Sequence, residues 1–272
     1  MLNPLTPAMA LETAMNTTSA DTPALGSVRP LVRYVDEDQA VLEVNFHVRP
    51  PVADRRRATP RRVEVQLHVR STDGFNDEER YVVTLQRGVG TVRMHLVSPQ
   101  LWWPVGMGQQ ALYDLDLQLI HRDRISDAWS HTVGLSSVRP RDGGTLTPAS
   151  LMINGQECRI SELLPIDAPD EQSFLPIGGQ SLVVVRGHYG PDVLYGAADR
   201  AGILMLQCVP IDPNGRPEQA LDAEVDRLAP HPCLAGWYVG HLGPAAKKIA
   251  RRLRQLDPTH GVFTDMPPLP AA

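Results

Sequence analysis

Five side chains that could transfer protons or bind a ligand stand next to predicted strands in the second half of the chain: Glu162, Asp167, Asp212, His241 and Asp265. The carboxyl ends of parallel strands in a barrel-like sheet meet on one face, so these groups are expected to lie together. Two carboxylates a few ångströms apart there could divide acid–base and nucleophilic roles, or chelate a divalent ion. The alternative is that they are ordinary loop carboxylates. The candidate catalytic residues are therefore Glu162, Asp212, His241 and Asp265.

One of these residues follows an especially apolar run. Residues 234–240 read Leu-Ala-Gly-Trp-Tyr-Val-Gly, which predicts a buried parallel strand that ends at His241 and Leu242. The imidazole of His241 can titrate near neutral pH, whereas the side chain of Leu242 can neither donate nor accept a proton. His241 and Trp237 are the candidate substrate-binding residues. A polar residue satisfied within the fold is the alternative for His241.

The first half of the chain carries the period-two pattern of strands. Val63, Val65, Leu67 and Val69 alternate with polar residues, and Gly88 lies in a hairpin turn. About seven such strands over residues 28–140 predict an immunoglobulin-like β-sandwich. Residues 1–27 and 267–272 are expected to be disordered tails.

Residues 149–266 alternate between strand and helix patterns. Helices are predicted at 191–201, 218–228 and 245–256, between five apolar strand segments near 157–164, 181–186, 203–209, 234–240 and 261–265. Such alternation requires parallel strands with right-handed crossovers. Because a closed barrel needs eight strands, the sequence predicts a multidomain β plus α/β protein, with the sandwich followed by a partial (β/α) barrel of about five strands.

Composition narrows the function classes. The net charge is −5 and the pI is about 6.0, so no global positive field recruits nucleic acid, and no apolar run has membrane-spanning length. Residues 1–22 lack the pattern of a signal peptide, which predicts a cytoplasmic protein. The three cysteines form no Cys-x-x-Cys motif, so neither a metal site nor a disulfide is expected, and nothing indicates a cofactor. The basic runs at 50–60 and 245–256 are typical of solvated surfaces, with an anionic partner as the alternative.

Several segments together resemble glycoside hydrolase family 2, which includes β-galactosidases, β-mannosidases and β-glucuronidases. The segment at 101–115 matches the family's Leu-Trp-Trp-Pro motif, with Trp102 and Trp103 expected to pack between the two domains. Further matches lie at 133–138, 152–155, 195–204 and 231–237. The resemblance covers about residues 28–265 and implies a sandwich followed by a TIM barrel, with retaining glycosidase activity that needs two carboxyl groups.

The same resemblance indicates what this sequence has lost. The family's acid/base Glu follows an Asn at the end of barrel strand four, and the matching positions here are Leu242 and His241. The family's nucleophile Glu comes from a strand near the end of the barrel, and this sequence stops before that strand. The family also has an Arg on barrel strand two, and its expected position here is occupied by Val184, so this Arg is expected to be lost. Residues 161–165 replace the family's glycine-rich turn after strand one.

The resulting hypothesis is a family 2-like protein without hydrolase activity of its own, which has a carbohydrate-binding or assembly role. One alternative is an active hydrolase of β-glycosidic bonds that uses substituted carboxylates or a partner chain. Another is a structural interaction module, since a partial barrel leaves open sheet edges that a second copy or a partner chain could cover.

Overall fold

The sandwich predicted for the first half of the chain is present in the structure, a computed structural model that describes residues 22–50, 62–141, 151–167, 181–211, 221–240 and 243–266. One sheet has the order β1-β2-β5 and the other β4-β3-β6-β7. All pairings are antiparallel. The strands are β1 (Ala24–Val35), β2 (Gln39–Arg49), β3 (Arg62–Ser71), β4 (Asn76–Thr84), β5 (Val89–Val97), β6 (Tyr113–His121) and β7 (Arg124–Val133).

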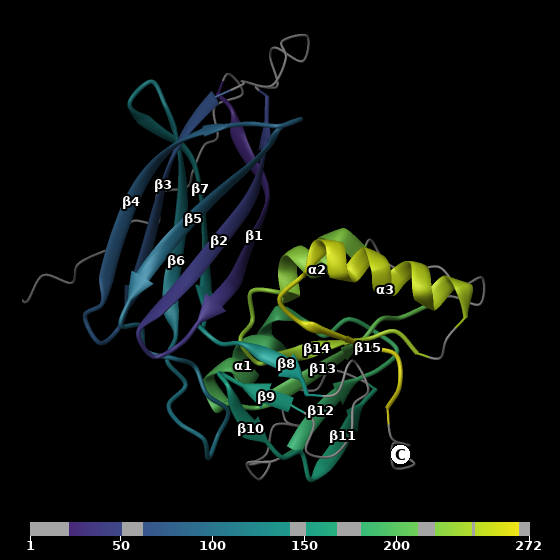
Figure 1. The fold of residues 1–272 in the computed structure, drawn as a ribbon. Helices are drawn as coiled ribbons and strands as arrows, with labels where there is room; N and C mark the ends of the chain where they lie inside the picture. Colours follow the sequence, from purple (N-terminus) through teal and green to yellow (C-terminus); the bar gives the residue numbers. More distant parts are fainter. Residues whose placement is uncertain are drawn as a thin grey trace, which may run out of the picture.

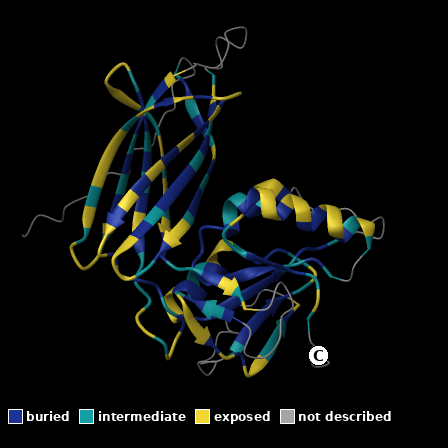
Figure 2. Ribbon diagram, in the orientation of Figure 1, coloured by how far each residue is buried: buried dark blue, intermediate teal, exposed yellow. Residues whose placement is uncertain are grey.

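Side-chain alternation explains why these strands pack face to face. In β5, Val92, Met94 and Leu96 are buried, while the residues between them are exposed. The β4–β5 connection turns through Arg87 and Gly88, both with positive φ, as the predicted hairpin requires. The inward side chains of both sheets form one apolar cluster (Figure 2).

A small antiparallel sheet links the sandwich to the second half of the chain. It has the order β10-β9-β8 and consists of β8 (Val138–Pro140), β9 (Leu151–Ile153) and β10 (Gln156–Cys158). Asn154 and Gly155 form the β9–β10 turn with positive φ. The single strand predicted at 157–164 is therefore wrong, because its first residues belong to β10 and its last to the next strand.

The second half contains five parallel strands, the number that the sequence predicted, although the first of them begins later than expected. They are β11 (Glu162–Ile166), β12 (Ser181–Val185), β13 (Leu204–Cys208), β14 (Leu234–Tyr238) and β15 (Gly261–Phe263), and they neighbour one another in chain order. Helices α1 (Asp192–Ala201), α2 (Leu221–Leu228) and α3 (Pro244–Leu256) connect them. Figure 1 shows α2 and α3 together on one side of the sheet, beside the lower part of the sandwich. This is the expected partial α/β barrel.

The Leu-Trp-Trp-Pro segment lies where the two parts meet. Trp102 is fully buried, and its Nε1 donates a hydrogen bond to the carbonyl oxygen of Asp199 on α1 at 2.8 Å. Asn154 in turn donates to the carbonyl oxygen of Trp102 at 3.0 Å. The predicted packing role of Trp102 is thus confirmed.

Among the described residues, no helix is long and apolar enough to cross a membrane.

Candidate site at the carboxyl end of the parallel sheet

The strand register gathers polar side chains at one end of the parallel sheet. Val184 of β12 lies opposite Pro165 and Leu206, and the ladder continues from Leu206 to Gly236 and from Cys208 to Tyr238. Side chains two residues apart share a face. Five residues at the carboxyl ends of the strands therefore share the face of the sheet that contains Val184. They are Asp167, Arg186, Cys208, Tyr238 and Asp265.

An ion pair lies at the ends of the first two strands. Arg186 donates from Nε to Oδ1 of Asp167 at 2.7 Å and from Nη2 to Oδ2 at 2.5 Å. This bidentate pair lowers the pKa of Asp167 through the hydrogen bonds from Arg186, so the carboxylate is ionised at neutral pH. Asp167 is exposed and Arg186 half-buried, so both groups can be reached by a ligand.

The buried side-chain amide of Gln207 holds the loop after Arg186 in place. Gln207 is fully buried in β13, and its Nε2 donates to the carbonyl oxygen of His188 at 2.8 Å. Its Oε1 accepts from Tyr195 at 2.7 Å and from the backbone N–H of Gly190 at 3.3 Å. Both ring nitrogens of His188 are buried without a partner among the described residues. The loop thus encloses an imidazole whose ring nitrogens make no hydrogen bond to the described residues.

Gln207 and His188 were missed by sequence reasoning. The available signal was a single polar residue, Gln207, within the apolar run 203–209.

Cys208 is no nucleophile, because burial raises the pKa of its thiol to about 12 and keeps it protonated at neutral pH. Tyr238, whose pKa is also raised by burial, offers a neutral hydroxyl.

Glu162 does not lie at this end of the sheet. It opens β11, opposite Ser181 at the start of β12. The four residues up to Ile166 place it about 13 Å away along the strand. The expectation that Glu162 follows a strand is wrong, because the strand starts at this residue instead of ending before it.

Asp265 does follow its strand, β15, and is exposed. Asp167 and Asp265 nevertheless lie at opposite edges of the sheet, with β12, β13 and β14 between them. Four strand spacings separate them by about 19 Å along the sheet. Asp212, His241 and Leu242 lie outside the described residues, so they remain sequence-based candidates.

Trp237 faces the other side of β14 from Tyr238. It is fully buried, and its Nε1 donates to Oδ2 of Asp257 at 2.8 Å. The buried Asp257 carboxylate also pairs with His260 at 2.8 Å, which lowers its pKa despite burial. The interpretation of Trp237 as a sugar-binding residue does not fit this placement, because its ring is enclosed between β14 and the end of α3.

An arginine is present at the end of the second parallel strand. Val184 is fully buried within β12, and Arg186 is the first residue after this strand. Arg186 lies two residues after Val184 and therefore shares its face of the sheet, and the inferred loss of the family's arginine at Val184 stays a prediction.

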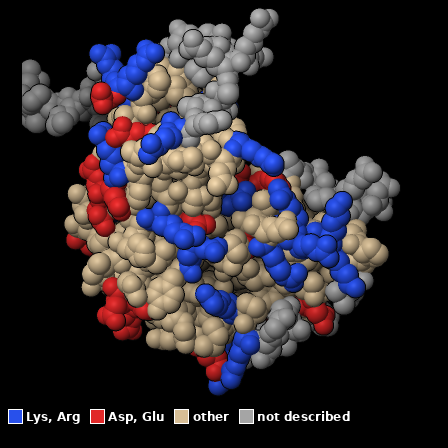
Figure 3. Space-filling model, turned by 45° about the horizontal axis from the view of Figure 1, so that its top comes forward, with Lys and Arg blue, Asp and Glu red and all other residues tan. Residues whose placement is uncertain are grey.

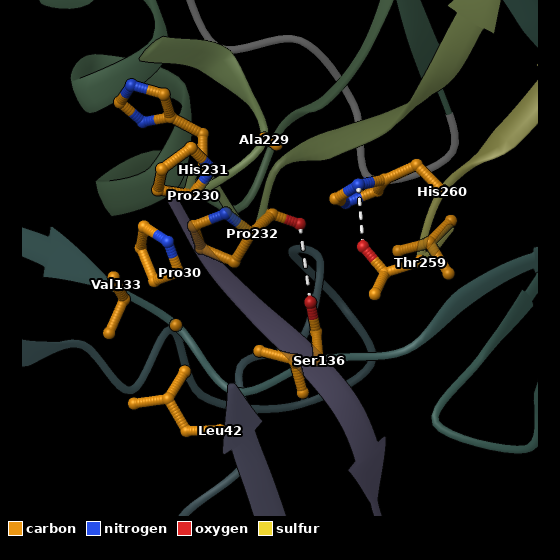
Figure 4. Close-up of a pocket in the computed structure, with 13 residues that line it drawn as sticks. Pro30, Leu42, Val133, Ser136, Ala229, Pro230, His231, Pro232, Thr259 and His260 are labelled. Atoms are coloured by element: carbon orange, nitrogen blue, oxygen red, sulfur yellow. Dashed lines mark hydrogen bonds between the residues drawn. The ribbon is translucent and has the colours of Figure 1, made fainter. Parts of the chain in front are cut away.

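A separate cavity lies between the sandwich and the parallel sheet (Figure 4). Its volume is about 20 Å³, which holds about one water molecule. Pro232 and Ser136 line it from the two sides, and Ser136 Oγ donates to the carbonyl oxygen of Pro232 at 3.5 Å. It is too small for a sugar. Within the described ranges, no cluster of three or more His, Cys, Asp or Glu side chains could hold a metal ion.

Comparison with known proteins indicates which family this chain is similar to. Residues 30–135 match the family described as glycosyl hydrolases family 2. An exo-β-D-glucosaminidase from Streptomyces avermitilis is 29% identical over 186 residues, which cover 58% of this chain and 21% of that protein. β-Mannosidase B from Thermothelomyces thermophilus is 28% identical over 182 residues, 55% of this chain and 21% of that protein. The chain spans about a fifth of the length of these curated relatives.

Solved structures extend the likeness to both parts of the fold. A family 2 glycosyl hydrolase from Bacteroides cellulosilyticus superposes with a TM-score of 0.68 at 15% identity, covering 90% of this chain and 35% of that one. The exo-chitosanase of Amycolatopsis orientalis gives a TM-score of 0.63 at 20% identity, with 90% and 33% covered. The TM-scores establish a shared fold, and at these low identities they establish the fold alone. The chain is therefore a protein similar to the family 2 glycosyl hydrolases, in sequence over its sandwich and in fold over its parallel sheet.

Proposed function

We propose that this chain binds a β-linked glycan at the carboxyl end of its parallel sheet and does not hydrolyse it alone. The relatives support the glycan class: they include exo-β-D-glucosaminidases and β-mannosidases, and the Amycolatopsis orientalis exo-chitosanase has been solved with PNP-β-D-glucosamine. Arg186 and Tyr238, both partly exposed, supply the donors and acceptors that sugar hydroxyls require. His241 is a further candidate ligand-binding residue.

Among the described residues, the main support for inactivity is the distance between the carboxylates at the carboxyl end of the sheet. A retaining glycosidase needs carboxyl groups about 5–5.5 Å apart and an inverting one about 6.5–9.5 Å. Asp167 is engaged by Arg186, and Asp265 lies beyond three intervening strands. In the sequence, Leu242 occupies the position where the resemblance places the acid/base residue. These observations support binding without turnover.

The first test is an assay of the purified chain. p-Nitrophenyl β-glycosides of glucosamine, mannose, galactose and glucuronic acid are expected to show no release of p-nitrophenol above the buffer rate. A wild-type rate above buffer that disappears in Asp265→Asn would overturn the proposal of inactivity.

The second test measures binding of the same glycosides by calorimetry. Arg186→Gln is expected to weaken binding about tenfold or more, because the ligand loses a charged donor and Asp167 loses its partner. Arg80→Gln is the control, since Arg80 also pairs with a carboxylate, Glu64, but is exposed and lies on β4. Absence of wild-type binding to every glycoside, or equal weakening in both variants, would refute binding at this end of the sheet.

The alternative is an active hydrolase with substituted carboxylates or a barrel completed by a partner chain or a second copy. It is favoured by the names of the relatives, all of which are glycosidases. It requires Glu162→Gln or Asp212→Asn to abolish a measurable rate. It also requires that sedimentation detect an assembly larger than one chain, if a second copy supplies the missing group.

A further inference from the structure

The outward side of α3 carries an unusual concentration of positive charge. Its thirteen residues include no acidic residue, whereas the whole chain has a net charge of −5. The exposed basic side chains of the helix are Lys247, Lys248, Arg251, Arg252 and Arg254. Figure 3 shows Lys and Arg side chains over much of this face, with one group of them at the right of the view, the side on which α3 lies in Figure 1.

Helix periodicity aligns three of these residues in a row. The buried residues Ala246, Ile249, Ala250, Leu253 and Leu256 hold α3 against the sheet. Lys247, Arg251 and Arg254 follow one another at spacings of four and three, which places neighbours about 5–6 Å apart along the opposite side. We call these three residues the α3 row.

The neighbouring carboxylates do not neutralise this row. On α2, Asp222 pairs with Arg252, Glu224 with Arg227, and Asp226 with Arg29 of β1. Within the described part of the chain, Lys247, Arg251 and Arg254 have no ion-pair partner. Three fixed cations are therefore available to an external anion.

The surroundings of the row restrict the kind of partner. All apolar residues of α3 are turned to the sheet or are small, so the helix offers nothing to insert into a lipid bilayer. The helix has no aromatic side chain on which a nucleic-acid base could stack. What remains is a line of charges suited to a flexible linear polyanion bound through its acidic groups.

We propose that the α3 row binds an anionic polysaccharide, namely a glycan with carboxylate groups along its chain. This inference rests on the proposed glycan-binding function and specifies its substrate class. The first turn of α3 follows β14 after residues 239–243, so the row begins near the carboxyl end of the sheet. A polymer whose terminal sugar occupies that end can continue along α3. A polymer of protonated amino sugars would be repelled by the same row.

The test uses the full chain and alginate as the carboxylated polymer. The variant Lys247→Gln/Arg251→Gln/Arg254→Gln is expected to bind alginate at least tenfold more weakly than wild type, with a shallower dependence of affinity on salt. The control Arg124→Gln/Arg139→Gln/Arg159→Gln removes the same charge from exposed arginines elsewhere and is expected to stay within twofold. Circular dichroism checks that both variants keep the wild-type fold.

Two results would overturn the inference. One is an equal loss in the control variant, which would mean that net charge alone governs binding. The other is binding of single-stranded DNA, of phosphatidylserine vesicles or of chitosan through the same residues as tightly as alginate. Failure of the proposed function is distinguishable, because binding of p-nitrophenyl glycosides depends on Arg186 and is expected to be unchanged in the α3 variant.

Discussion

Asp199 of α1 ties together three segments that are distant in the sequence. It is 2% exposed, and its Oδ2 lies 2.6 Å from Nδ1 of His231. Its Oδ1 accepts from the backbone N–H of Cys233 at 3.1 Å, and its carbonyl oxygen accepts from Trp102. A single carboxylate thus orients the residues that lead into β14, and its role is structural although it lies within a family-like motif.

Replacement of Asp199 by alanine is expected to lower the free energy of unfolding by about 3 kcal/mol, because it leaves the His231 ring and a buried N–H without acceptors. Urea denaturation measures the loss. Asp192→Ala on the same helix removes only an exposed pair with Arg227 and is expected to cost about 1 kcal/mol or less. Similar values for the two variants would contradict the assigned role of Asp199.

Strand β7 brings a titratable ring to the boundary between the sandwich and the parallel sheet. His131 stacks on Trp129 with ring centroids 5.7 Å apart and meets His231 edge to face at 5.2 Å. Burial and the adjacent His231 lower the pKa of His131 to about 4, against the opposing effect of Asp199 and Asp192. The ring is therefore neutral in the folded protein at neutral pH.

This lowered pKa predicts acid sensitivity. The unfolded chain binds a proton at His131 near pH 6.5 and the folded protein only near pH 4, so stability falls as the pH decreases between these values. The loss amounts to roughly 2–3 kcal/mol. His131→Phe, which keeps an aromatic ring without a titratable group, is expected to flatten the curve of unfolding free energy against pH in this window. His95→Gln on the exposed side of β5 is expected to leave the curve unchanged.

At the scale of the whole molecule, the sandwich and the α/β part share a close-packed boundary. A Cβ atom at Gly134 would lie 2.5 Å from Cγ of Pro232 and 3.0 Å from Cβ of Trp102. Arg29 of β1 also donates to Asp226 of α2, and to the carbonyl oxygen of Leu256 at 3.0 Å. We therefore expect the two parts to unfold together.

Gly134→Ala tests this coupling. The added methyl group must push Pro232 and Trp102 apart, which is expected to cost about 1–3 kcal/mol and to lower the Tm in scanning calorimetry. Gly196→Ala on α1 is the control and is expected not to lower the Tm, because a Cβ atom there has only the side chain of Arg200 nearby, at 3.5 Å. An unchanged Tm for Gly134→Ala would show that this boundary is loosely packed.

Local patterns were sufficient for most elements. The alternation in β3, the hairpin turn at Gly88 and the number of parallel strands were predicted, since burial of one face and turn geometry depend on neighbouring residues. The orientation of Trp237 and the location of Glu162 could not be predicted reliably, because each depends on where a strand starts and on its register with the adjacent strand. A change of one residue in either moves a side chain to the other face.

The sequence by itself determined the sandwich, the parallel sheet and the basic side of α3, whereas the replacement of a proton-transfer residue by Leu242 stays a prediction. Only the tertiary structure decided that Asp167 pairs with Arg186, that Gln207 positions the loop of His188, and that Asp265 lies across the sheet from Asp167. The physical reason is that composition and periodicity act over a few residues. The distance between two functional groups is set by strand order and register across the whole sheet.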